Sequence, residues 1–199
     1  MTTAKVMFDP FSTDFFNAPF ATYRRMLLFP VEVITRLRGV PAELRQKVRR
    51  SHCEHPDQWQ MLLDDRRRIP AAVEELLRWE APAQYLVRYS IKDVELHGTT
   101  IPAGNPVLLC LGSANRDERA FADADTFDIN RDRSQAQNLG LGYGTHSCLG
   151  AALARMESAI ALDKLLDHMP RYAIVQEGLK RVAMTNVIGW NNVPMRVLG

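Results

Sequence analysis

The chain has 199 residues, of which 46% are hydrophobic and 24% are charged. These values are typical of a globular domain and exclude a disordered tail, a collagen repeat and a disulfide-rich miniprotein. The formal net charge of +2 gives no reason to expect nucleic acid as a partner. The longest apolar run, residues 107–111, is far shorter than the roughly 18 residues of a transmembrane helix, so we expect no membrane span.

The cysteines are few. There are 3, Cys53, Cys110 and Cys148, and the opening stretch MTTAKVMFDP lacks the features of a signal peptide. This pattern predicts a protein of the reducing cytoplasm, where a special cysteine serves as a ligand or a nucleophile and not as half of a disulfide.

The first part of the chain is punctuated by prolines. Residues 1–26 are rich in aromatic residues, and residues 27–80 favour helices. Pro41, Pro56 and Pro70 each stand where a helix could begin, because proline is tolerated at the first helical position. Apolar residues follow the last two prolines at helical spacing: Trp59, Leu62 and Leu63, then Val73, Leu76 and Leu77.

The pattern then changes from helix to strand. Residues 84–112 alternate and contain turn signals, which predicts a small antiparallel β-meander with a buried strand at Val107–Leu111. Residues 113–147 are loop-rich, and a helix is expected from about Leu149 to His168. Its expected apolar stripe is Leu149, Leu153, Met156 and Ile160. The tail predicts short strands with Asn191–Asn192 at a turn. The predicted fold class is mainly α with a small β-meander, an α+β fold.

The sharpest motif is GLGYGTHSCLGAALAR, residues 140–155. A glycine-rich loop delivers Cys148 to the start of an amphipathic helix, where the helix dipole favours a thiolate. Such a thiolate is a nucleophile, with His146 as its candidate base, or a metal ligand; a buried structural cysteine is the plain alternative. No CxxC pair is present, which disfavours zinc. The glycines at 142, 144 and 150 allow another body to approach the backbone closely.

The segment GYGTHSCLG resembles the haem-ligand loop of the cytochrome P450 family, the haem-thiolate monooxygenases. The resemblance implies that Cys148 is the metal ligand, the axial thiolate of haem b iron. It implies that His146 donates to a haem propionate, and that Gly144 and Gly150 let the loop lie under the porphyrin. Leu141 stands where the family has phenylalanine, a position that shields the thiolate.

Three arginines and a glutamate extend the resemblance. Glu75-Leu-Leu-Arg78 is similar to the family's Glu-x-x-Arg pair, and Arg131 stands where a third member of that structural network is expected. Without the downstream loop, Glu75 and Arg78 would be read as an ion pair on a solvated helix face. Arg88 resembles the arginine that neutralises a haem propionate in bacterial members.

The resemblance covers the chain unevenly. It indicates one shortened domain over residues 1–199: an N-terminal segment 1–26, a mid-family helical segment 27–54 and a C-terminal haem-binding portion 55–199. Blocks of the family pattern are missing near Arg25–Leu28 and near Arg50–His55. The second gap removes the central distal helix, and no Ala-Gly-x-(Asp/Glu)-Thr motif occurs. We therefore expect the proximal half of the fold, with no catalytic residue assigned on the distal side.

The implied function is that of a haem-thiolate oxidoreductase, which in an intact member hydroxylates a small apolar substrate. Electrons would come from NAD(P)H through a ferredoxin-like donor. That donor would dock on a basic proximal face, whose expected members are Arg66, Arg67, Arg68, Arg116, Arg119 and Arg155.

Other interpretations remain open. The chain is alternatively a catalytically incompetent remnant that binds haem weakly or acts as an interaction module. A non-haem cysteine enzyme using Cys148 and His146 is a third reading. The run His52-Cys53-x-His55 is a weak candidate metal site.

Overall fold

A computed structural model describes residues 55–181 and 186–198, all within the compact unit Val40–Gly199. The expected segments 1–26 and 27–54 lie outside the described residues. Of the second expected gap, near Arg50–His55, only His55 is described. The helix expected after Pro41 and the expected gap near Arg25–Leu28 also lie outside.

The first described helices begin at the expected prolines. Helix α4 spans Pro56–Asp64, the short 3-10 helix η2 spans Arg66–Arg68, and α5 spans Ile69–Trp79. Trp59 and Leu62 of α4 are buried, as are Val73, Leu76 and Leu77 of α5. The Trp59 indole donates from Nε1 to the carbonyl of Pro170 (3.0 Å), which ties α4 to the chain that follows the last helix.

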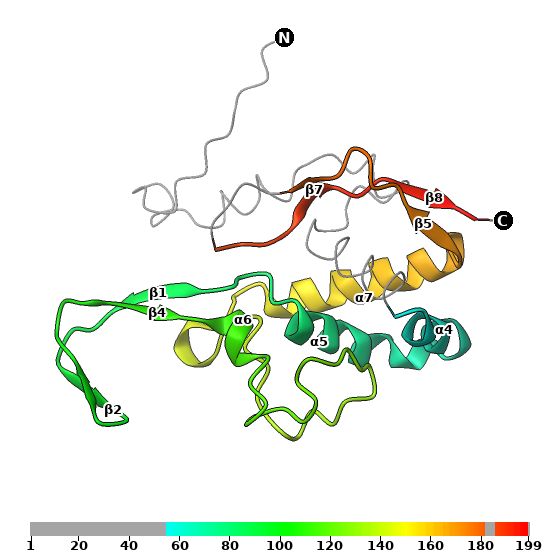
Figure 1. Cartoon of the computed structure of the whole chain (residues 1–199). Coiled ribbons are helices and arrows are strands. Elements are labelled where there is room, and N and C mark those ends of the chain that lie inside the picture. The colour runs from blue at the N-terminus through cyan, green and yellow to red at the C-terminus, as the bar shows by residue number, and fades with distance from the viewer. Residues whose placement is uncertain (1–54, 182–185, 199) are drawn as a thin grey trace, which may run out of the picture. The chain divides into compact units, whose positions relative to one another are not determined.

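Residues 86–109 form a two-stranded ribbon (Figure 1). Strand β1, Leu86–Tyr89, pairs antiparallel with β4, Pro106–Leu109, and β2, Val94–Leu96, pairs with β3, Thr99–Ile101. The expected meander is wrong, since a meander pairs each strand with the next. The reason is the turn at His97–Gly98, where both residues have positive φ, +48° and +77°. A two-residue turn of this kind closes a tight hairpin, which the outer strands extend.

The strand expected to be buried at Val107–Leu111 is also wrong. The side chains of Leu108 and Leu109 are 54% and 39% exposed. Leu111 is buried, but it begins the short helix α6, Leu111–Ala114. A ribbon of two strands has no second layer of its own to bury both faces.

The C-terminal part contains the longest described helix and two small sheets. After the 3-10 helix η3, Gly144–His146, comes α7, Ala151–His168. Strand β5, Tyr172–Ile174, pairs with β8, Met195–Val197, and β6, Lys180–Arg181, pairs with β7, Trp190–Asn192. The residues expected at a turn, Asn191 and Asn192, lie in β7. The Asn192 side chain accepts from the Lys180 amide and donates to the Gly178 carbonyl, and so extends the ladder.

Helix α7 packs beside α5 with the face opposite to the expected one (Figure 1). The buried residues are Ser158, Leu162, Leu165 and Leu166. The predicted stripe is exposed: Leu149, Leu153, Met156 and Ile160 are 75%, 39%, 54% and 56% accessible. The helix carries apolar residues on both sides, so periodicity could not tell which side meets α5. Such a helix is typically covered all round.

No helix among the described residues is long and apolar enough to cross a membrane.

The described architecture is a helical layer of α4, α5 and α7 with small antiparallel sheets, which agrees with the expected α+β composition.

The two sides of α7 predict different responses to truncation. Leu162→Ala should lower the free energy of unfolding by about 2–5 kcal/mol, because Leu162 is fully buried. Ile160→Ala should cost less than about 1 kcal/mol, since its side chain is half exposed. Urea unfolding followed by circular dichroism measures both. Equal losses would mean that the Ile160 side of α7 is covered in solution.

Candidate functional site

The loop that carries Cys148 is held by its own backbone. The Gly142 amide donates to the Leu139 carbonyl (2.9 Å), and the Cys148 amide donates to the Leu141 carbonyl (2.8 Å). Gly150 is the N-cap of α7, so the helix begins slightly later than expected and Cys148 lies just before it. The Cys148 side chain is exposed and free of any disulfide. The alternative of a buried structural cysteine is therefore wrong.

Glycines shape this loop at two points. Gly142 has φ +77°, and a Cβ built there would lie 3.3 Å from the His146 carbonyl oxygen, so a larger residue would be strained and crowded. Gly150 has an ordinary φ, but its Cβ would lie 3.9 Å from the Cys148 sulfur. A longer side chain at Gly150 would begin to cover the thiol, so this glycine keeps the sulfur accessible.

Arg88 and His146 line the same cavity. Its volume is about 400 Å³. Arg88 comes from β1, where it is half-buried, and His146 ends η3, where it is exposed. The other walls are mostly apolar: Leu86, Leu109, Cys110, Leu111, Ala114, Leu139, Gly142 and Tyr143. The structure thus brings two of the predicted site residues to one apolar cavity, whose lining ends two residues before Cys148.

The pairing needed for a cysteine nucleophile is not formed. No hydrogen bond or ion pair joins His146 to Cys148 within residues 55–181. Leu141, the residue in the family's phenylalanine position, is half-buried, and its carbonyl accepts the Cys148 amide.

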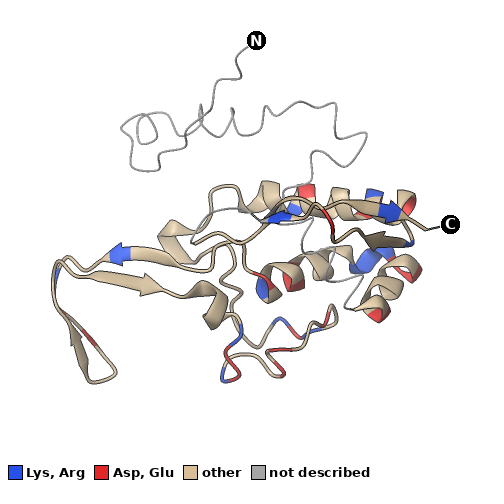
Figure 2. Ribbon diagram, turned by 45° about the horizontal axis from the view of Figure 1, so that its top comes forward, with Lys and Arg blue, Asp and Glu red and all other residues tan. Residues whose placement is uncertain are grey.

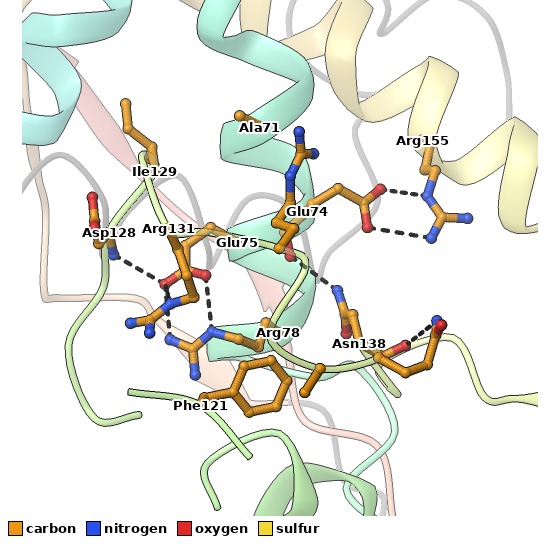
Figure 3. Close-up of a pocket in the computed structure, with 13 residues that line it drawn as sticks. Ala71, Glu74, Glu75, Arg78, Phe121, Asp128, Ile129, Arg131, Asn138 and Arg155 are labelled. Atoms are coloured by element: carbon orange, nitrogen blue, oxygen red, sulfur yellow. Dashed lines mark hydrogen bonds and ion pairs between the residues drawn. The ribbon is translucent and has the colours of Figure 1, made fainter. Parts of the chain in front are cut away.

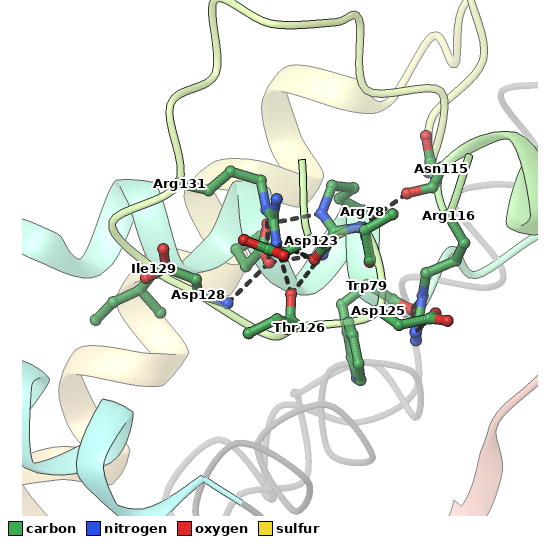
Figure 4. Close-up of polar contacts among 12 residues, drawn as sticks. Arg78, Trp79, Asn115, Arg116, Asp123, Asp125, Thr126, Asp128, Ile129 and Arg131 are labelled. Carbon is green, nitrogen blue, oxygen red and sulfur yellow. Dashed lines mark hydrogen bonds and ion pairs between the residues drawn. The ribbon is translucent and has the colours of Figure 1, made fainter. Parts of the chain in front are cut away.

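A buried ionic network joins Arg78 of α5 to Asp128 and Arg131 (Figure 4). The Arg78 guanidinium grips the Glu75 carboxylate with two hydrogen bonds of 2.8 Å, and the Arg131 Nε donates to the same carboxylate at 3.2 Å. The Asp128 amide adds a fourth donor at 3.0 Å. The side chains of Glu75, Arg78 and Arg131 are 4%, 3% and 7% exposed. The reading of a solvated helix face is therefore wrong.

Arg78 also connects α5 to the long loop between α6 and α7. It donates to the carbonyls of Asn115 and Ala124, each at 2.8 Å, and to that of Thr126 at 3.0 Å. Arg131 donates to the same Thr126 carbonyl at 2.6 Å. The two guanidiniums thus satisfy backbone oxygens that no sheet or helix would pair.

Sequence reasoning gave no role to Asn115 and Asn138. Asn115 is fully buried, and its Oδ1 accepts the Leu139 amide at 2.8 Å. Its Nδ2 donates to Asn138 Oδ1 (3.2 Å), and Asn138 Nδ2 donates to the Glu74 carbonyl (3.0 Å). The only sequence signal is their position, since both lie in the loop-rich stretch 113–147 and Asn138 precedes the glycine-rich loop.

The expected basic face is not an uncompensated positive patch, because each of its arginines has a carboxylate partner. Figure 2 shows acidic and basic residues intermixed along the loop between α6 and α7 and on α7. Short Asp-to-Arg spacings along the chain provide three of these pairs. The pairs are Arg66 with Asp163 and Asp167, Arg67 and Arg68 with Asp65, Arg116 with Asp125, Arg119 with Asp117, and Arg155 with Glu74.

These contacts also shift ionisation. Hydrogen bonding from Arg119 lowers the pKa of Asp117 to about 2, and the hydrogen bond to Glu74 raises the pKa of Arg155. Arg116 differs, because burial lowers its pKa. Its guanidinium lies 3.3 Å from the centroid of the Trp79 ring and donates to the Trp79 carbonyl. This arginine therefore packs against α5 more than it faces solvent.

The candidate metal site around His55 gains no support. His52 and Cys53 lie outside the described residues, and the His55 ring packs against Phe127 with the centroids 4.9 Å apart. The described part of the chain contains no group of three or more His, Cys, Asp or Glu residues that could hold a metal ion.

Comparison with known proteins identifies the family. The sequence model of the family described as Cytochrome P450 matches residues 33–184. The chain belongs to the cytochrome P450 family.

Curated relatives are of bacterial origin. The chain is 45% identical over 143 residues to cytochrome P450 130 of Mycobacterium tuberculosis, covering 71% of this chain and 35% of the relative. It is 49% identical over 117 residues to the mycinamicin IV hydroxylase/epoxidase of Micromonospora griseorubida, covering 58% and 29%. The chain thus spans about a third of the length of these relatives.

Solved structures show the same partial coverage. The structure of P450BioI in complex with a fatty acid-ligated acyl carrier protein has a TM-score of 0.73 at 35% identity, covering 78% of this chain and 40% of that one. The structure of CYP109E1 from Bacillus megaterium with corticosterone has a TM-score of 0.72 at 33% identity, covering 77% and 41%. The described fold is therefore a partial cytochrome P450 fold.

The buried network predicts a large loss of stability when one partner is removed. Glu75→Ala should lower the free energy of unfolding by about 3–5 kcal/mol, because it leaves two guanidiniums without their carboxylate. Arg66→Ala is the matched control: its ion pairs are about one-third to one-half exposed, so the loss should stay within about 1 kcal/mol. Chemical denaturation compares the two. A Glu75 variant as stable as the control would contradict the buried network.

Proposed function

We propose that this chain is a haem-thiolate oxidoreductase chain that binds haem b iron through Cys148. The observation that supports this most is the placement of Arg88 and His146 on one mostly apolar cavity, whose lining ends two residues before the exposed Cys148. The chemistry of these groups matches the cofactor. A thiolate suits the iron, apolar walls suit the porphyrin, and a guanidinium and an imidazole suit its two carboxylates.

Each residue has a separate task in this proposal. Cys148 would supply the sulfur ligand to the iron, and Gly150, where a Cβ would lie 3.9 Å from that sulfur, leaves it uncovered. Arg88 would form an ion pair with one haem propionate, and His146 would donate a hydrogen bond to a propionate. Gly144, with φ +67° and no atom within 4 Å of its would-be Cβ, leaves room for the flat ring beside the loop. When bound, the haem supplies oxygen activation that the thiolate's electron donation favours.

The substrate and the electron source follow from the family. One relative is named a hydroxylase/epoxidase and another a steroid C26-monooxygenase. By extension, the intact activity here would be hydroxylation of a small apolar substrate. The electrons would come from NAD(P)H through a ferredoxin-like partner protein. The Glu75, Arg78 and Arg131 network would brace the cysteine loop during this cycle.

A second candidate function is that of a remnant which binds haem weakly and does not turn over. The exposed apolar side of α7 favours it, because Leu153, Met156 and Ile160 are 39%, 54% and 56% exposed. Turnover separates the two. Substrate-dependent consumption of reductant by the haem-loaded chain, with a competent donor protein, would support the oxidoreductase. Bound haem without such consumption would support the remnant.

The carbon monoxide difference spectrum tests thiolate ligation. Reduced, haem-loaded protein should show the strongly red-shifted Soret band of a thiolate complex, and Cys148→Ala should abolish it. Cys110→Ala is the matched control, because Cys110 is an exposed thiol that lines the cavity of Arg88 and His146 and should leave the band in place. A band typical of histidine-ligated haem in the unmodified chain would refute the proposal.

Arg88→Ala should weaken haem binding without changing the position of that band. The loss of one propionate contact should raise the Kd for haem about tenfold, the equivalent of one charge-assisted hydrogen bond. Haem titration followed by absorbance measures the Kd. An unchanged Kd would remove Arg88 from the site.

A further inference from the structure

The long loop between α6 and α7 has almost no regular structure, so most of its polar groups need partners elsewhere. Most of its side-chain contacts hold the first part of the loop against α5. One set of hydrogen bonds is different, because it reaches the amides of Leu139 and Gly140 at the start of the cysteine loop. This set is formed by Asn115 and Asn138, and the proposed function does not use either residue.

Asn115 connects the ionic network to the cysteine loop. Its backbone carbonyl accepts from the Arg78 guanidinium, and its side-chain Oδ1 accepts from the Leu139 amide, both at 2.8 Å. The residue is fully buried. A buried amide side chain whose oxygen and nitrogen are both used has one preferred orientation, so the Leu139 amide is fixed relative to Arg78.

Asn138 fixes the next residue of the loop against α5. Its Oδ1 accepts both the Gly140 amide (2.9 Å) and Asn115 Nδ2 (3.2 Å), while its Nδ2 donates to the Glu74 carbonyl (3.0 Å). Figure 3 shows Asn138 pointing toward Glu74, beside a cavity of about 380 Å³ that also contacts Glu75 and Arg131. At Gly140 the backbone lies so close to the Leu77 carbonyl that a Cβ would clash with it.

The bonds continue from this anchor to the sulfur-bearing residue. The Leu139 carbonyl accepts the Gly142 amide, and the Leu141 carbonyl accepts the Cys148 amide. A rotation of the chain at Leu139 or Gly140 would therefore displace the acceptors that hold Gly142 and Cys148. The tether acts on the cysteine only through the loop, since neither asparagine is hydrogen-bonded to Cys148.

We infer that Asn115 and Asn138 are positioning residues that fix the Cys148 loop on α5 and so keep the thiolate aligned for the iron. This inference rests on the proposed function for its second half, the alignment of the thiolate. Its first half, the tether, concerns the protein without haem and is testable separately.

The variants are Asn115→Ala, Asn138→Ala and Asn138→Asp. The aspartate keeps the acceptor for the Gly140 amide, removes the donor to the Glu74 carbonyl and places a negative charge beside that carbonyl, so it breaks this contact in a residue of the same size. Gln137→Ala is the matched control, because it removes an exposed neighbouring amide whose bond to the Asn138 carbonyl is long, at 3.3 Å. Circular dichroism selects the variants that retain the native helical signal, and Asn138→Asp serves if the alanine variants do not fold.

Hydrogen–deuterium exchange of haem-free protein reads the tether. The Asn variants should raise the exchange rate in the 139–148 segment about tenfold or more, as the loss of one or two buried hydrogen bonds predicts. Gln137→Ala should not. Wild-type exchange in folded Asn variants would overturn the inference.

The carbon monoxide spectrum of haem-loaded protein reads the alignment. The Asn variants should convert at least about half of the thiolate-type Soret band to the form without thiolate, as tenfold loosening of the loop predicts. Faster exchange with an undiminished thiolate band would overturn the positioning role. A wild-type protein with no thiolate band refutes the proposed function instead, so the two failures are distinguishable.

Discussion

The burial of the Glu75 carboxylate is the constraint on which the described structure depends. A lone carboxylate inside a protein would be strongly destabilising, so Glu75 is stable there only with its donors in place. Those donors come from α5 itself through Arg78, and from the long loop through Arg131 and the Asp128 amide. Because Arg78 also binds three loop carbonyls, the same charge cluster decides where a segment without secondary structure lies against α5.

Two sets of contacts position the candidate site relative to the Glu75 network and the loop that it holds against α5. From one side, the buried Asn115 and the half-buried Asn138 connect the Glu75 network to the loop that bears Cys148. From the other side, the Gly112 amide at α6 donates to the Gln84 carbonyl just before β1 (3.0 Å), so the strand that presents Arg88 starts at a fixed point. These contacts hold two walls of the cavity lined by Arg88 and His146, the one at Leu139 and the one at Leu111. The cysteine loop is irregular and β1 is a regular strand, but the positions of both depend on hydrogen bonds to other segments as well as on their own backbone pairing.

Much of this was predictable from the sequence, and the failures have physical causes. Pro56 and Pro70 marked helix starts because proline is suited to the first turn, and the cysteine motif placed Cys148 just before a helix. The nesting of the ribbon was missed because alternation predicts strands but not their pairing, which the turn at His97–Gly98 decides. The charge balance of the expected basic face could not be read from the sequence, because a run of arginines says nothing of acids that fold onto it, such as Asp163 against Arg66.

Helix α7 has one buried side and one exposed apolar side, and the exposed side bears on the proposed function. Its buried side, with Leu162 and Leu166, packs on α5, whereas Leu153, Met156 and Ile160 are apolar and exposed. The exposed side begins one to two turns after Cys148, and Tyr143 and Leu149, the residue that follows Cys148, are exposed as well. Water at a thiolate weakens its donation to a metal, since solvent access and hydrogen bonds to the sulfur tune the bound iron. Leu149 directly follows Cys148 and is 75% exposed, so a partner that covered this apolar surface would also reduce the access of water to the sulfur.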